Sequence, residues 1–142
     1  MSLVFLSPFV GYVSSAILNN HLHQKLGQRG VALTCGLCHT VAYTVIALHP
    51  PYAVVVMAFM LAGFAGGVAS AAWNAWVGNL ANSSELLGFL HASYGAGGVA
   101  SPLIATSLIA KSGLQWYTFY YLMVSLTLKT TLPEIKLPTR AL

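Results

Sequence analysis

The chain contains 142 residues (15.0 kDa), of which 57% are hydrophobic and 6% are charged, and its mean hydropathy is +0.75. A soluble domain carries roughly 25% charged residues because its surface must face water, and six basic plus two acidic residues are too few for that. Disorder requires the opposite composition, and the scattered basic residues form no stripe of the kind that binds nucleic acid. The composition therefore predicts an integral membrane protein. It excludes a soluble enzyme, a disordered chain and a nucleic-acid-binding domain.

Five apolar segments are candidates for membrane-spanning helices. A helix needs about 20 mostly apolar residues to cross about 30 Å of hydrocarbon, and continuous runs favour helices over the alternating pattern of barrel strands. In chain order, the segments are residues 3–19, 31–48, 52–77, 86–110 and 116–128. The last segment is short, and Pro133 and Pro138 argue against its continuation. We therefore expect an all-α polytopic helix bundle of about five transmembrane helices in residues 1–128, followed by a polar cytoplasmic tail in residues 129–142.

The basic residues predict how the bundle is oriented. Cytoplasmic connections carry the excess of Lys and Arg in membrane proteins. If the first connection is cytoplasmic, five basic residues lie inside and only Lys111 lies outside. The five inside residues are Lys25, Arg29, Lys129, Lys136 and Arg140. A multi-pass chain that begins on the outer face and ends in the cytoplasm fits this pattern.

Small residues mark one face of the third segment and one face of the fourth. Membrane helices associate through close packing of small residues and through polar contacts, because lipid offers no hydrophobic drive between them. Gly63 and Gly67 lie four residues apart on one face. The fourth segment carries Gly95, Gly98 and Pro102 in a similar arrangement. We expect these five residues to lie at close helix–helix contacts.

Four polar or aromatic residues on the same two segments are candidates for contact with a solute. A polar side chain at membrane depth is costly unless it faces protein or a watery cavity, and both Asn74 and His91 are placed at such a depth. Trp73 lies beside Asn74 and Tyr94 follows His91 by three residues. Tryptophan often forms a wall for sugar rings, although it is also common at membrane interfaces. The alternative interpretation is that these side chains only pack against other helices.

The segment Cys35–His39 reads CGLCH, which matches the attachment signature of c-type haem. The motif lies inside an apolar run, so its thiols would face the bilayer or the bundle core. We therefore interpret Cys35, His39 and Tyr43 as a polar packing stripe along one helix face. Because Glu85 and Glu134 are the only acidic residues, general acid–base chemistry has almost no groups to use. We expect no enzyme activity, no cofactor and no metal site.

The connection after the first segment resembles a loop signature of the major facilitator superfamily. Residues 20–29 read NHLHQKLGQR, and the family pattern between its second and third helices is GxLADRxGRR. Gly27 and Arg29 match that pattern, and Lys25 conserves its charge. Asn20, Gln24 and Gln28 stand where the family has glycine, aspartate and arginine, respectively. The glycine- and proline-rich run GAGGVASP at residues 95–102 resembles the motif of the family's fifth helix.

Several further segments are similar in sequence to a fungal group of this superfamily, the bypass-of-stop-codon proteins. These proteins are themselves similar to fucose permeases. The segments are FLSPFVGY at 5–12, AWNAWVGN at 72–79 and SPLIAT at 101–106. The resemblance covers residues 3–123, and the five segments correspond to helices two to six of the N-terminal half.

The resemblance implies a secondary active transporter of a small, sugar-like solute that works by alternating access between two six-helix halves. It implies a location in a lipid bilayer, most simply the plasma membrane. It also implies that this chain lacks the first helix and the second half, so that it cannot transport alone.

Two other hypotheses compete with a transporter fragment. The chain could be a non-transporting membrane protein that associates with other helices as a structural or regulatory partner. It could also be a membrane haem protein, which would show Soret absorbance from haem bound at Cys35 and Cys38.

Overall fold

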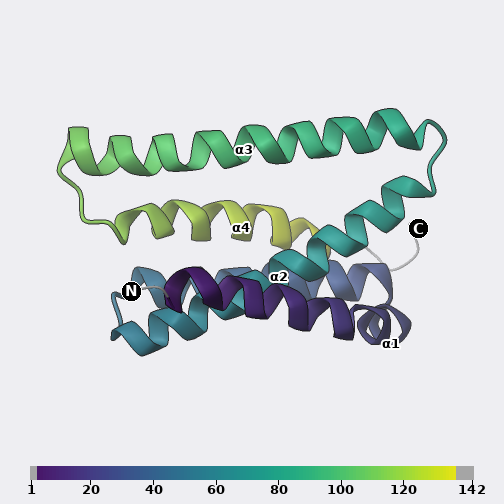
Figure 1. Cartoon of the computed structure of the whole chain (residues 1–142), viewed down its shortest axis with the longest axis horizontal. Helices are drawn as coiled ribbons and strands as arrows, with labels where there is room; N and C mark the ends of the chain where they lie inside the picture. Colours follow the sequence, from purple (N-terminus) through teal and green to yellow (C-terminus); the bar gives the residue numbers. More distant parts are fainter. Residues whose placement is uncertain (1–2, 137–142) are drawn as a thin grey trace.

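The computed structural model describes the backbone of residues 3–136 and the side chains of residues 3–133. Within this part of the chain all regular structure is helical, and the expected all-α fold is confirmed (Figure 1). The helices are α1 (Leu3–Ala47), α2 (Tyr52–Gly78), α3 (Ser83–Ser112) and α4 (Thr118–Lys136).

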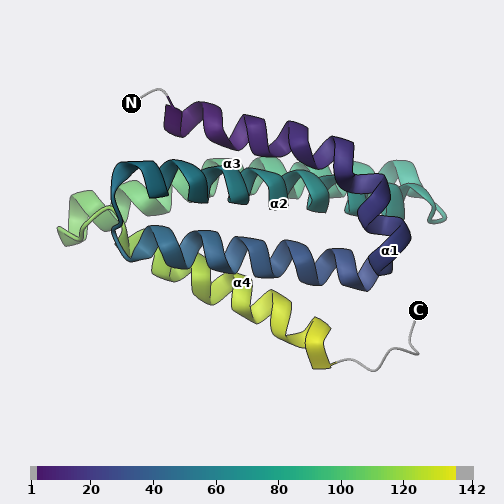
Figure 2. The same ribbon diagram turned by 90° about the horizontal axis from the view of Figure 1, so that it is seen from below.

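Helix α1 consists of two helical segments that meet at Gly27. This residue has φ 63° and ψ −179°, which is not helical, and the chain reverses its direction there (Figure 2). The two segments, residues 3–26 and 28–47, correspond to the first two predicted spans. The predicted connection of residues 20–30 is wrong in extent, because residues 20–26 are helical and the break is confined to one glycine. Polar composition suggested a loop, but a helix can carry polar residues in the turns beyond the hydrocarbon core.

Helix α2 packs against both segments of α1, and it lies between them in the view of Figure 2. Against the second segment, Val31 and Cys35 of α1 form a buried apolar cluster with Val68 and Ala72 of α2. Against the first segment the contact is made by small residues, which allow the two backbones to approach closely. These three segments form the most closely packed part of the bundle.

Helix α4 extends well beyond its predicted end at Leu128. It continues to Lys136 with Pro133 inside it, so the expectation that proline ends the helix is wrong. Its 19 residues span about 28 Å, close to the hydrocarbon thickness, at 1.5 Å per residue. Thr131, beyond the predicted end, is buried against Gly36 of α1. This packing stabilises the extra turns although Pro133 donates no backbone hydrogen bond.

Helix α3 lies apart from the other helices and contacts mainly α2 (Figure 1). None of its residues is buried. An added Cβ at Gly95 or Gly98 would meet no atom within 4 Å. The expected close approach of another helix to these glycines therefore involves no segment that the structure describes, and their packing role stays a prediction.

Two helices among the described residues, α1 and α2, are long and apolar enough to cross a membrane by length and composition. Helix α3 has 30 residues but is interrupted by glycine, serine, His91 and Pro102. Residues of this kind lower the mean hydropathy of the helix without shortening it.

Candidate solute-binding cavity

A cavity of about 830 Å³ lies between α1, α2 and α3. Both segments of α1 contribute to its lining, and α2 forms its longest wall. The cavity exists because α3 stands away from α1 and touches only part of α2. No Asp, Glu, Lys or Arg is among the described side chains that line it. Its polar groups are therefore amides, hydroxyls and imidazoles.

All four predicted solute-contacting residues line this one cavity. Trp73 and Asn74 reach it from α2, and His91 and Tyr94 reach it from α3. The structure brings these residues together although the helices share few contacts. Whether they bind a solute is addressed below as a proposal.

On the α2 side of the cavity, the polar and aromatic residues Ser70, Trp73 and Asn74 lie within about one helical turn. The Asn74 side-chain amide donates a hydrogen bond of 2.7 Å to the Ser70 backbone carbonyl, which fixes its orientation. One N–H and the side-chain carbonyl oxygen of the amide are left to meet another partner. The ring centroids of Trp73 and Trp76 lie 5.8 Å apart at 79°, an edge-to-face arrangement that supports the Trp73 ring.

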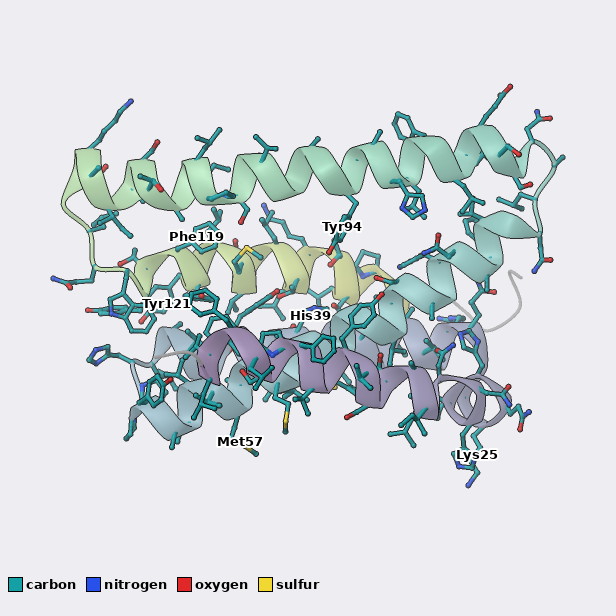
Figure 3. All side chains as sticks on the ribbon, viewed as in Figure 1. Lys25, His39, Met57, Tyr94, Phe119 and Tyr121 are labelled. Atoms are coloured by element: carbon teal, nitrogen blue, oxygen red, sulfur yellow. The ribbon has the colours of Figure 1, made fainter. Side chains whose placement is uncertain are left out.

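The α3 side of the cavity is more open. Tyr94 is 79% exposed, and Figure 3 shows its side chain projecting from α3 toward the side of the molecule on which His39 of α1 lies. His91 lies one turn before it and is also exposed. These two residues face space that no described side chain fills.

Sequence reasoning missed two further cavity residues, His39 and Tyr43. Both line the cavity, and their rings lie 5.5 Å apart. The CGLCH pattern drew attention to the haem signature, and the stripe with Cys35 was interpreted as packing. The residue spacing did identify the shared face. It could not indicate that the same face turns from a packed contact at Cys35 to a cavity at His39.

The CGLCH segment is an ordinary helical stretch in this structure. Cys35 is buried in the apolar cluster between α1 and α2, and Cys38 is half-buried; both thiols are free. No group of three His, Cys, Asp or Glu side chains suited to a metal occurs in the described residues.

The loop motif lies at the reversal of α1. Gly27 provides the break, Lys25 is exposed at the outside of the bend, and Arg29 is half-buried at the start of the second segment (Figure 3). The match of Gly27 to the family pattern therefore has a backbone reason, because φ 63° with ψ near 180° is essentially restricted to glycine.

The glycines of α2 lie against the first segment of α1. A Cβ on Gly63 would overlap the backbone of Pro8, and one on Gly67 would overlap the Ser15 side chain. Gly11 faces the α2 backbone at Met60 in the same way. Pro102 is exposed on α3 and contacts nothing comparable.

Comparison with known proteins identifies the family. Residues 1–133 match the family model of the Major Facilitator Superfamily. Bypass of stop codon protein 6 of Saccharomyces cerevisiae is 27% identical over 124 residues, which cover 84% of this chain and 24% of that protein. The chain therefore spans about a quarter of the length of that relative. No solved structure matches the chain. The resemblance expected from the sequence is confirmed, and the chain belongs to the Major Facilitator Superfamily, whose members are integral membrane transporters of small solutes.

Proposed function

We propose that the chain forms part of the N-terminal half of a multi-pass secondary transporter, and that its cavity binds a neutral, sugar-like solute. The observation that carries this proposal is the convergence of Trp73, Asn74, His91 and Tyr94 on one cavity of about 830 Å³. Ligand cavities typically measure about 300–1,000 Å³ and combine apolar walls with a few polar groups. A hexose presents hydroxyls to such groups and an apolar ring face to tryptophan.

A neutral solute is favoured over a charged one by the lining of the cavity. A charged group at membrane depth requires a partner of opposite sign, and none of the described lining residues supplies one. The Asn74 amide can both donate and accept, which suits hydroxyl groups.

In the proposed transporter this cavity is one wall of a midplane site, and a second half supplies the other wall. Alternating access would then result from rocking of the two halves around the solute. The described helices supply one wall of this proposed site, and we therefore expect the chain alone to bind solute without moving it. The five helical segments, the family and the basic residues at the α1 reversal support placement across a membrane with that reversal in the cytoplasm. A fungal plasma membrane is the proposed location.

The binding proposal is tested by titrating the chain in lipid nanodiscs with neutral hexoses while recording tryptophan fluorescence. We expect saturable binding of the hexose. Trp73→Phe should remove the fluorescence change that reports this binding, and Asn74→Ala should weaken the binding about tenfold, the usual effect of losing one hydrogen bond. Trp116→Phe is the matched control, because Trp116 does not line the cavity and its ring contacts His49, Tyr117 and Tyr120 instead. Equal binding of hexoses by wild type and Asn74→Ala, or binding only of charged solutes, would contradict the proposal.

A second candidate function rests on the uncovered state of α3. A helix without a single buried residue is suited to association with other helices, as a non-transporting structural or regulatory partner requires. This alternative predicts no hexose binding but a defined dimer in nanodiscs, counted by single-molecule photobleaching. Gly98→Leu should abolish that dimer.

A further inference from the structure

A second, smaller cavity of about 350 Å³ lies between α1, α2 and α4. It adjoins the cavity described above, because His39, Ala69 and Trp73 line both. Three hydroxyl groups face it from α4, those of Thr127, Thr130 and Thr131, and nothing in the family resemblance assigns them a role.

The His39 ring presents a hydrogen-bond acceptor at the boundary between the two cavities. Its Nδ1 lies 3.0 Å from the backbone carbonyl oxygen of Cys35. A carbonyl oxygen can only accept, so Nδ1 carries the proton. In the neutral ring Nε2 is then an acceptor without a proton.

The threonine hydroxyls also present acceptors rather than donors. Thr131 donates to the Thr127 carbonyl at 2.7 Å, and Thr130 donates to the same carbonyl at 2.9 Å. Thr127 donates to the carbonyls of Met123 and Val124, both at 3.0 Å. A hydroxyl has a single proton, which these helix carbonyls occupy, so its lone pairs are what it offers to a ligand.

The polar lining of the second cavity is therefore dominated by acceptors, with the Gln28 amide as a group that can also donate. Apolar residues of α2, including Ala72 and Trp73, form the opposite wall. A carboxylate or phosphate would meet lone pairs here and would lose its hydration without compensation. A group that donates hydrogen bonds and has an apolar face fits.

We propose that this second cavity is a hydroxyl-binding subsite, in which His39 Nε2 and the α4 threonines accept hydrogen bonds from a polyol. The inference rests on the proposed function for its solute class, and it adds α4 and His39 to the residues that determine specificity. It implies that the hydroxyls at one end of the solute are recognised as donors.

The first test compares D-glucose with its mono-deoxy analogues in the nanodisc titration. We expect at least one deoxy analogue to bind the wild type about tenfold more weakly than glucose, because one hydrogen bond is lost. That difference should disappear in His39→Leu and shrink in Thr131→Val, which keeps the side-chain shape. Thr44→Val is the matched control, since Thr44 also donates to its own helix, at 2.7 Å, but lines neither cavity.

The outcomes separate the two proposals. If Asn74→Ala weakens glucose binding while His39→Leu and Thr131→Val leave the deoxy difference unchanged, the subsite is wrong and the proposed function stands. If no hexose binds, the proposed function fails, and the subsite is decided by a measurement that uses glycerol as the probe.

That measurement is ¹⁵N nuclear magnetic resonance of histidine-labelled chain in nanodiscs. We expect the His39 signals of an Nδ1–H imidazole and a shift of its Nε2 resonance when glycerol is added, reduced in Thr131→Val and unchanged in Thr44→Val. A proton on Nε2 in the neutral ring, or no response to glycerol, would overturn the subsite.

Discussion

Gly27 is the residue on which the reversal of α1 depends. Its φ of 63° with ψ of −179° lies in a region that side chains other than hydrogen make very costly. We expect Gly27→Ala to lower the free energy of unfolding by about 1–3 kcal/mol. Sodium dodecyl sulfate titration of the chain in mixed micelles, followed by circular dichroism, measures this change.

The control for this prediction is Gly78→Ala, at the last residue of α2. A Cβ there would meet no atom within 4 Å, and its backbone is not left-handed. It should change stability by less than about 0.5 kcal/mol. Equal losses of stability in the two variants would show that the backbone conformation at Gly27 does not require glycine.

At the residue level, sequence reasoning was most informative where a local pattern carries the information. The family pattern singled out Gly27, and helical spacing placed Asn74 and Tyr94 on faces that meet one cavity. Sequence reasoning failed at His39, because the residue spacing on one helix face does not show how far the packed contact with the neighbouring helix extends. Cys35 and Ala72 pack against each other in the α1–α2 contact and also line the second cavity, and His39, one turn further along α1, lines both cavities.

At the scale of elements, the contact between the first segment of α1 and α2 depends on glycine. Gly63 lies against the Pro8 backbone, which cannot rotate away as a side chain could. We expect Gly63→Ala to separate the helices and to cost about 1–3 kcal/mol, as overpacking does. The same micelle titration measures it.

Gly66 offers a matched control on the same helix. A Cβ at Gly66 would meet no atom within 4 Å, and alanine favours a helix over glycine by about 1 kcal/mol. Gly66→Ala should therefore be neutral or stabilising. If Gly63→Ala were equally harmless, the close approach of the two helices would be wrong.

The contact between α1 and α4 provides a test of how far α4 extends. A Cβ on Gly36 would overlap the Thr131 side chain, and one turn away the hydroxyl oxygens of Thr40 and Thr127 lie 3.4 Å apart. We expect Gly36→Ala to destabilise the chain and Thr131→Ala to relieve part of that loss. A double-mutant cycle should give a coupling of about 0.5–3 kcal/mol. Additive effects would mean that α4 ends before Thr131, as its proline-rich sequence suggested.

The ends of helices were the least predictable elements, for a physical reason. Hydropathy reports the part of a helix that lies in hydrocarbon, so residues 20–26 and 129–136 were assigned to connections. The structure shows both as helical, because backbone hydrogen bonding continues wherever packing supports it. Pro133 removes one donor near the end of α4, and the buried Thr131 preceding it keeps the helix in place.

At the scale of the whole molecule, the number of helical segments and their order followed from the apolar runs, whereas the position of α3 did not. Amphipathic pattern cannot place a helix whose contacts lie outside the described residues. Gly63 and Gly67 of α2 lie against α1, whereas a Cβ added to Gly95 or Gly98 of α3 would meet no described atom within 4 Å. Identical sequence signals therefore have different surroundings. This asymmetry supports the proposal that α3 faces further helices in a larger transporter.

The same asymmetry predicts that the chain alone binds a solute without transporting it. Full-length transcripts of the locus are sequenced first, and any further helices in frame are then expressed together with this chain. In proteoliposomes, the 142-residue chain should give labelled-hexose uptake equal to that of empty liposomes, because alternating access in the proposed transporter requires a second half. The longer product should restore uptake, and Trp73→Ala in that product should reduce it at least tenfold, whereas Trp116→Phe should not. Hexose uptake by the short chain itself would contradict the proposed division of the site between two halves and would make α1–α4 a complete carrier.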